Sequence, residues 1–253
     1  MLFQLSAACG CNIGRVRFNN EDNFFFDGKS LTEENAGLSG YVVKKVYLEK
    51  EILFGVFDGM GGEEFGEKAS FAAAECAGKT MDRCRRFAVG PRSLLLQLCA
   101  EANRSICRKR DELLVNRMGT TAAMLLFVPD EVYVCNLGDS RIYRLRDNEL
   151  SQISVDDVEQ VPEGVGRKAG LTQFLGVPED ELMLEPHIVK CELKRGDVFL
   201  ICSDGLTDMV SNLDICMHLR QHISAKRNVQ HLIGHALRNG GRDNVTAIVI
   251  RID

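Results

Sequence analysis

Strand-like and helical segments follow one another in blocks along this chain of 253 residues, and their order limits the fold more than any other feature. Strand-like apolar runs come first, then two consecutive helical stretches, then more strands, two more helices and a final strand. A parallel βαβ sheet needs single strands and helices in alternation, whereas grouped helices are typical of an α+β protein. The order therefore predicts a mainly antiparallel sheet system with helices on its outer faces.

The expected strands are short, apolar and rich in β-branched and aromatic residues. They cover residues 13–26, 40–47, 52–57, 122–128, 131–137, 141–145, 150–153, 187–193, 198–202 and 245–252. Apolar residues at helical spacing predict helices over about 65–80 and 91–113, and two more after Ser211. Ser211 with Asp214 forms an N-terminal capping signature. Because no repeat or Pro/Ser-rich linker interrupts the chain, one domain over 1–253 is expected.

Composition narrows the classes of partner. The formal net charge of −5 argues against nucleic acid, which binds proteins through an excess of Lys and Arg. Most of the 10 Cys lie in apolar runs, as buried reduced thiols of a cytoplasmic protein do. The sequence has no signal-peptide pattern and no apolar run of bilayer length. We therefore expect a cytoplasmic protein that binds no nucleic acid and no membrane, and a monomer, since nothing in the sequence calls for an oligomer.

Aspartates stand at the ends of several predicted strands. The carboxylates concerned are those of Asp22, Asp58, Asp139, Asp204 and Asp243. A carboxylate at the edge of a core must find hydrogen bonds, an ion pair or a metal. Several carboxylates gathered together repel one another unless a cation neutralises them, and hard oxygen ligands favour Mg²⁺, Mn²⁺ or Ca²⁺ over zinc. The pattern indicates a divalent-metal site, provided that the fold brings these residues together.

Each of these residues taken alone has a simpler interpretation. An isolated Asp-Gly is more often a turn than a metal ligand. Asp139 and Asp243 alone favour turns or helix caps, and Arg17 alone is a surface strand residue. The conjunction of these residues, and their order along the chain, carry the metal-site interpretation.

Seven short motifs spread over nearly the whole chain resemble those of the type 2C metal-dependent protein phosphatases, in the same order. They are Arg17-Phe-Asn-Asn-Glu-Asp22, Phe57-Asp-Gly-Met-Gly-Gly62 with Gly66, Gly119-Thr-Thr121, Asn136-Leu-Gly-Asp-Ser-Arg141, Leu171-Thr-Gln-Phe-Leu-Gly176, Cys202-Ser-Asp-Gly-Leu206 and Gly241-Arg-Asp-Asn-Val-Thr246. No single motif is decisive, but seven in order are highly specific. Met60, where other members carry His, resembles the bacterial branch. The resemblance implies a central antiparallel β-sandwich flanked by helix pairs, in four layers α-β-β-α.

The resemblance also implies a reaction, the hydrolysis of phosphoserine and phosphothreonine in proteins with two Mn²⁺ or Mg²⁺ ions. Such ions lower the pKa of a bound water and offset negative charge on the phosphoryl oxygens. Arg17 would grip the substrate phosphate, because its planar fork matches phosphate geometry. The implied partners are a phosphoprotein substrate and a cognate Ser/Thr kinase or a phosphorylated regulator.

Roles for the acidic residues follow from the same resemblance. Asp58 would bridge the two ions, and the backbone carbonyl of Gly59 would bind one of them. Asp204 and Asp243 would complete the shell of the first ion. The remaining ligands implied are Glu21 and Asp22 for the second ion, partly through water, and Asp139 and Asp208 for a third, weaker ion.

Two features depart from the family's usual pattern. Met60 replaces a His that could donate a proton to the leaving seryl oxygen, so that water must donate it, as in the bacterial branch. The flap segment is also short, because Ser154-Val-Asp-Asp157 stands near the family's Thr-x-Asp-His-like motif and only 158–170 remain before Leu171. A flap shortened to about 154–170 predicts a more open cleft with looser substrate selection.

Three other functions compete with this one. A catalytically silent member of the family would bind a phosphoprotein or regulator, but every expected metal Asp is present. A phosphoaspartyl enzyme with Asp58 as nucleophile normally has a second Asp two residues later, where this chain has Met60. A calcium-binding structural module lacks support, since no run of alternating acidic residues resembles an EF-hand loop.

Overall fold

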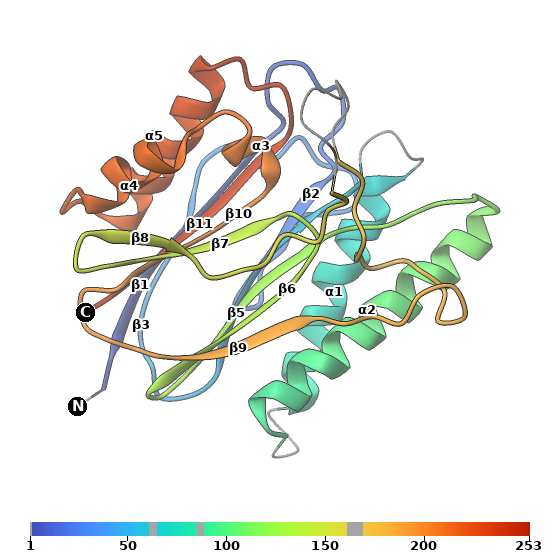
Figure 1. The fold of residues 1–253 in the computed structure, drawn as a ribbon, viewed down its shortest axis with the longest axis horizontal. Coiled ribbons are helices and arrows are strands. Elements are labelled where there is room, and N and C mark those ends of the chain that lie inside the picture. Colours follow the sequence, from blue (N-terminus) through green and yellow to red (C-terminus); the bar gives the residue numbers. More distant parts are fainter. Residues whose placement is uncertain (1, 61–64, 85–88, 161–168) are drawn as a thin grey trace.

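Two antiparallel sheets pack face to face in the computed structural model of the chain, and helices cover their outer sides (Figure 1). The structure describes residues 2–60, 65–84, 89–160 and 169–253. The layers run helices, sheet, sheet, helices, so the predicted α+β sandwich with flanking helix pairs is confirmed. No helix among the described residues combines the length and apolar character that a bilayer crossing requires.

The first sheet has six strands and the second has five. The six-stranded sheet has the order β3 (Val42–Tyr47), β1 (Gln4–Asn12), β11 (Val245–Ile252), β10 (Val198–Cys202), β7 (Arg141–Arg146) and β8 (Glu149–Gln152). The five-stranded sheet has the order β2 (Asp22–Phe26), β4 (Ile52–Asp58), β5 (Ala122–Val128), β6 (Glu131–Leu137) and β9 (His187–Glu192). All pairings are antiparallel among the described strands, which explains why the chain needs no single crossover helices.

The space between the sheets is filled by alternate residues of the central strands. In β5, Ala123, Leu125 and Phe127 face this core, while Met124 and Leu126 face the helices. A chain of edge-to-face aromatic contacts crosses the sandwich, with ring centroids 4.9, 5.9 and 5.6 Å apart along Phe26, Phe54, Phe127 and Phe199. Because both faces of the central strands are buried, these strands appear in the sequence as continuous apolar runs.

Helix pairs cover the two outer faces. The helices α1 (Gly66–Cys84) and α2 (Pro91–Leu113) pack on the five-stranded sheet. The helices α4 (Asn212–Arg220) and α5 (Ala225–Arg238) pack on the six-stranded sheet, after the single turn α3 (Asp204–Thr207). The predicted cap at Ser211 is confirmed, because its side chain accepts the backbone N–H of Asp214.

The N-terminal region corrects the strand expected over 13–26. Only Asp22–Phe26 forms a strand, and residues 13–21 form a loop. Gly14 has a φ of +84°, and a Cβ there would lie 2.3 Å from the carbonyl oxygen of Asp243, so the backbone turns against another loop. The sequence analysis missed β1, because Ala7, Ala8 and their neighbours are small and carry a weak strand signal.

Candidate active site

Two pairs of strand ends place acidic residues at one end of the sandwich. Asp22 begins β2 and Asp58 ends β4, and the two are directly paired across the five-stranded sheet. In the other sheet, Asp204 follows the end of β10 and Asp243 precedes β11, and the two strand ends are joined because Ser203 N–H donates to the carbonyl of Thr246 at 3.1 Å. The antiparallel pairing therefore brings together residues that lie far apart in the sequence.

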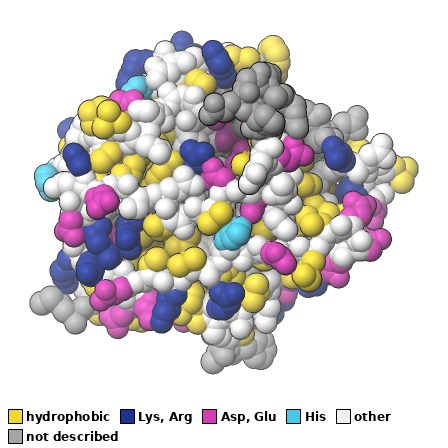
Figure 2. Space-filling model, viewed as in Figure 1, with side chains coloured by type: hydrophobic (Ala, Val, Ile, Leu, Met, Phe, Trp, Pro, Cys, Tyr) yellow, Lys and Arg dark blue, Asp and Glu magenta, His cyan; other side chains and the backbone are white. Residues whose placement is uncertain are grey.

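A cavity of about 230 Å³ opens among these strand ends. Its lining comprises Arg17, Asp58, Gly59, Met60, Thr121, Asp139, Ala169, Leu171, Asp204 and Asp243. Figure 2 shows acidic side chains around a recess in the upper half of the face drawn, whereas the rest of that face mixes both signs of charge. Six of the nine predicted site residues thus line one acidic cavity, and Glu21, Asp22 and Asp208 are not among the lining residues.

Asp58 lies at the centre of this negative charge. Burial raises the pKa of its carboxyl well above the usual range, and the carboxylates of Asp204, Asp22, Asp139 and Asp243 raise it further, in that order. Each of these neighbours disfavours the ionised form of Asp58 by like-charge repulsion. Such a concentration of carboxylates favours the binding of a cation.

Asp22 lies behind the cavity, with only 1% of its surface exposed. Its Oδ2 accepts hydrogen bonds from Ser203 Oγ at 2.8 Å and Thr246 Oγ1 at 2.6 Å. Its Oδ1 is buried and has no hydrogen-bond partner among the described residues. Burial, more than the neighbouring Asp204 and Asp243, raises the pKa of Asp22 to about 7 against the opposing effect of the two hydroxyl donors.

Arg17 is paired with Asp243, its Nη2 lying 2.7 Å from Asp243 Oδ2. The other oxygen of Asp243, Oδ1, accepts the backbone N–H of Asn244 at 2.8 Å. Within the described ranges, no three acidic, histidine or cysteine side chains form a ready-made set of metal ligands. Donors within the protein hold Asp22 Oδ2 and both oxygens of Asp243.

Gly59 brings three backbone segments into contact. Its N–H donates to the carbonyl of Glu21 at 3.1 Å. A Cβ at this position would lie 2.3 Å from the carbonyl oxygen of Gly66 and 2.7 Å from that of Glu21, so only glycine fits without a shift of the backbone. Burial raises the pKa of the Glu21 carboxyl, and Arg17 opposes that rise.

These residues fit a divalent cation of the hard type. The side chains that line the cavity offer carboxylate oxygens, and that lining, as far as the structure describes it, contains no cysteine and no histidine. The unpaired buried oxygen of Asp22 and the raised pKa of Asp58 are both costs that a positive ion would offset. The predicted ligand roles stay predictions, because the positions of the ions are not observed.

Asp208 stands apart from the other predicted ligands. It is the exposed C-cap of α3, and its backbone N–H donates to the carbonyl of Asp204 at 2.8 Å. It thus lies one helical turn beyond Asp204 and outside the lining of the cavity. A third ion held by Asp139 and Asp208 therefore remains a prediction of the sequence.

Asn244, to which the sequence analysis assigned no role, holds the loop before β2. Its side chain, 3% exposed, accepts the backbone N–H of Glu21 at 2.8 Å and donates to the carbonyls of Ile13 and Asn19 at 2.9 and 3.0 Å. Asn244 therefore fixes both ends of the loop that carries Arg17. The signal available in the sequence was its position between Asp243 and the final strand.

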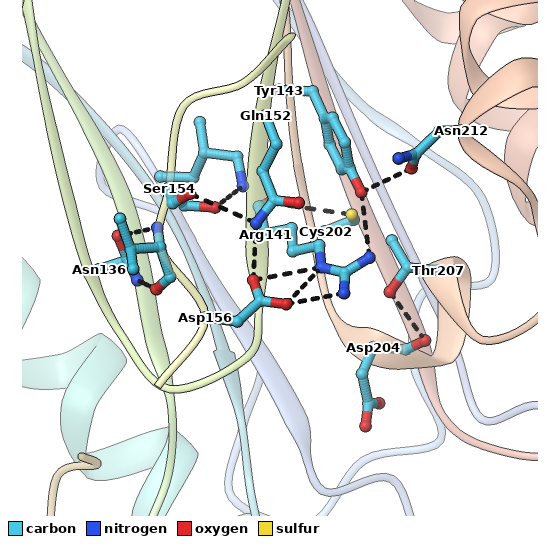
Figure 3. Close-up of polar contacts among 12 residues, drawn as sticks. Asn136, Arg141, Tyr143, Gln152, Ser154, Asp156, Cys202, Asp204, Thr207 and Asn212 are labelled. Atoms are coloured by element: carbon cyan, nitrogen blue, oxygen red, sulfur yellow. Dashed lines mark hydrogen bonds and ion pairs between the residues drawn. The ribbon is translucent and has the colours of Figure 1, made fainter. Parts of the chain in front are cut away.

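A second network lies beside Asp204 and fixes residues 154–157. Arg141 donates from Nη2 to Asp156 Oδ2 at 2.7 Å and from Nε to both oxygens of the same carboxylate (Figure 3). Asn136 Nδ2 donates to the carbonyl of Val155, and Asp157 Oδ2 accepts the N–H of Gly138 at 2.9 Å. In Figure 3 the carboxylate of Asp204 points away from this network.

Parts of two predictions lie outside the described residues. The glycines at 61 and 62 and residues 161–168 of the proposed flap are not described. The base of that segment is closed, because Glu159 N–H donates to the carbonyl of Gly170 at 2.9 Å and Thr172 N–H to that of Asp157 at 2.9 Å. The effect of a shortened flap on substrate selection stays a hypothesis.

The chain is similar to a group of known bacterial enzymes. The family profile described as Protein phosphatase 2C matches residues 43–237. The serine/threonine protein phosphatase PstP of Mycobacterium tuberculosis is 32% identical over 250 residues, which are 93% of this chain and 43% of PstP. The chain therefore spans less than half the length of PstP. The serine/threonine phosphatase Stp of Listeria welshimeri is 28% identical, and the match covers 94% of this chain and 92% of Stp.

Solved structures agree in fold. The crystal structure of the PstP catalytic domain in complex with two manganese ions has a TM-score of 0.75 and 29% identity, and covers 99% of both chains. The serine/threonine phosphatase of S. agalactiae has a TM-score of 0.78 and 27% identity, and covers 98% of this chain and 100% of that one.

Proposed function

The chain belongs to the protein phosphatase 2C family, and from that premise we propose that it is a metal-dependent phosphatase of phosphoserine and phosphothreonine in proteins. The observation that carries this proposal is the acidic cavity, in which Asp58, Asp139, Asp204 and Asp243 lie beside the guanidinium of Arg17. The two manganese ions are a property of the PstP structure and reach this chain as a proposal.

Oxygen donors of the cavity would hold two Mn²⁺ or Mg²⁺ ions. In the proposed assignment Asp58 is shared, the Gly59 carbonyl holds one ion, and Asp204 and Asp243 complete the other shell. Glu21 and Asp22 would hold the second ion, partly through water, as the resemblance implies. When bound, the ions supply the positive charge that lowers the pKa of an attacking water.

Arg17 binds the substrate phosphate in this proposal. Its guanidinium offers parallel N–H donors that match two phosphoryl oxygens, and its side chain is 38% exposed at the cavity. The ion pair with Asp243 fixes the guanidinium beside the carboxylates before a substrate arrives. Arg17 thereby orients the phosphate and offsets the charge that gathers on it as the P–O bond breaks.

The leaving seryl or threonyl oxygen needs a proton, which Met60 cannot provide. A thioether is a weak acceptor and has no donor hydrogen. The described part of the cavity lining contains no histidine. We therefore assign the donated proton to water that enters from the open side of the cavity.

A silent phosphoprotein-binding module is the alternative, in which the cavity binds a phosphorylated side chain through Arg17 without hydrolysis. Release of phosphate from a phosphothreonine peptide decides between the two, with Mn²⁺, Mg²⁺ or EDTA and with Asp204→Asn beside the unchanged protein. We expect release that requires metal and falls at least about a hundredfold in the variant. No release with any metal, from protein whose circular dichroism shows it folded, would instead establish the silent module.

A further inference from the structure

Phe18 is the most exposed large hydrophobic side chain among the described residues, with a relative exposure of 102%. It directly follows Arg17, and Val16 on the other side of Arg17 is 58% exposed. Leaving a Phe side chain in water forgoes the free energy that its burial would release. The two exposed apolar side chains that flank Arg17 form an apolar surface beside the cavity, which a bound partner would cover.

The loop that carries Phe18 is held on both sides. Arg15 N–H donates to the carbonyl of Gly241 at 2.8 Å, and Asn19 Nδ2 donates to Glu67 Oε2 at 3.0 Å. Asn244 holds both ends of the loop and Arg17 is paired with Asp243. The exposure of Phe18 is thus imposed by a fixed backbone, and a partner would meet a preorganised side chain.

The size of the cavity decides what that partner is. Its volume of about 230 Å³ lies below the roughly 300 Å³ at which pockets for drug-sized ligands begin. The cavity can take a phosphorylated side chain, and the rest of the peptide must cross the rim. An extended peptide advances about 3.3 Å per residue, and consecutive Cα atoms of the loop are about 3.8 Å apart. Because Phe18 directly follows Arg17, a residue close to the phosphorylated one comes within reach of Phe18 when Arg17 holds the phosphate.

Charge near the rim disfavours an acidic substrate residue at that point. Asp243 is half-exposed, and Glu67 faces the same loop through its hydrogen bond with Asn19. An acidic side chain on the substrate would be repelled there. The cavity lining also includes the apolar side chains of Met60, Ala169 and Leu171.

We propose that Phe18 is a specificity-determining residue, which packs against a large apolar side chain adjacent to the phosphorylated serine or threonine of the substrate. This inference rests on the proposed phosphatase function and names its preferred substrate class. Phe18 supplies apolar contact for the peptide and takes no part in the chemistry of the phosphate.

Two phosphothreonine peptides that differ only in Leu or Ser beside the phosphothreonine test the proposal. Their kcat/KM values are measured with the unchanged protein, with Phe18→Ala and with Leu114→Ala, each divided by the rate on p-nitrophenyl phosphate. Leu114 is 91% exposed at the end of α2 and outside the cavity lining, so its variant is the matched control. We expect a preference for the Leu peptide of about tenfold that Phe18→Ala abolishes and Leu114→Ala keeps.

Binding of the same labelled peptides, measured by fluorescence anisotropy with Asp204→Asn in the presence and absence of Phe18→Ala, provides a readout without turnover. The proposal is overturned if, in either measurement, the preference for the Leu peptide is the same with Phe18 and with Ala at position 18. It is also overturned if neither measurement shows a preference for the Leu peptide. Failure of the proposed function has another signature, namely no release even from p-nitrophenyl phosphate, in which case the anisotropy ratio alone decides on Phe18.

Discussion

Asp58→Asn is expected to be more stable than the unchanged protein without metal and less stable than it with metal, and to be inactive. Burial and four neighbouring carboxylates raise the pKa of Asp58 in the folded state above its unfolded value. Above the unfolded pKa of about 4, the unfolded state releases the Asp58 proton more readily than the folded state does, so Asp58 destabilises the fold, and that cost is present at pH 7. Neutral Asn removes it, so the variant should melt at a higher temperature than the unchanged protein in EDTA.

In saturating Mn²⁺ the unchanged protein should instead melt at a higher temperature than the variant. A ligand that binds only the folded state at 100 times its Kd stabilises it by about 2.7 kcal/mol. The unchanged protein should gain this free energy of stabilisation. The variant lacks the Asp58 carboxylate and should gain far less. Phosphate release by the variant should fall by about 10²–10³-fold or more.

Differential scanning fluorimetry measures the melting temperatures of both proteins in EDTA and in Mn²⁺, with Asp130→Asn as control. Asp130 is an exposed acid in the turn between β5 and β6, where neutralisation should change neither melting temperature. A variant at position 58 that is less stable than the unchanged protein in both conditions would contradict the electrostatic account.

Arg17→Lys should lower kcat/KM by about 10²-fold although it keeps the positive charge. The reason is geometric, because an ammonium group cannot offer two parallel N–H donors to two phosphoryl oxygens. The Ki for inhibition by inorganic phosphate should rise in the same variant, since the product binds through the same donors.

Arg15→Lys supplies the matched control for this prediction. Arg15 lies two residues earlier in the same loop and is exposed, so its conservative replacement should leave kcat/KM unchanged. Equal losses in both variants would assign the effect to the loop as a whole, and no loss at position 17 would exclude Arg17 as the phosphate ligand.

The sequence predicted the sandwich well because its central strands are buried on both faces. A strand such as β5 has no polar alternation to confuse with a helix, and the grouped helices excluded a parallel sheet. The prediction failed at the N-terminus, where the small residues of β1 gain their strand conformation from pairing with β3 and β11. Tertiary pairing of this kind leaves little trace in local propensity.

The membership of the site was predictable in part. Asp58 and Asp204 follow apolar strands, which is a local signal, whereas the pairing of Arg17 with Asp243 joins residues 226 positions apart. Asp22 was expected as a ligand of the second ion, and this role stays a prediction, although its hydrogen bonds to the hydroxyls of Ser203 and Thr246 could not be read from the sequence. Phe18 carried no signal at all, because exposure is a property of the folded loop.

The central claim is that strand ends of both sheets hold metal ions in one cavity. Diffraction at a wavelength where manganese scatters anomalously, from crystals grown with Mn²⁺, tests it most directly. The account predicts two anomalous peaks in the cavity, with Asp58 contacting both and the carbonyl of Gly59 contacting one. A cavity without manganese, in which Arg17 still pairs with Asp243 and Asp58 contacts no ion, would contradict it.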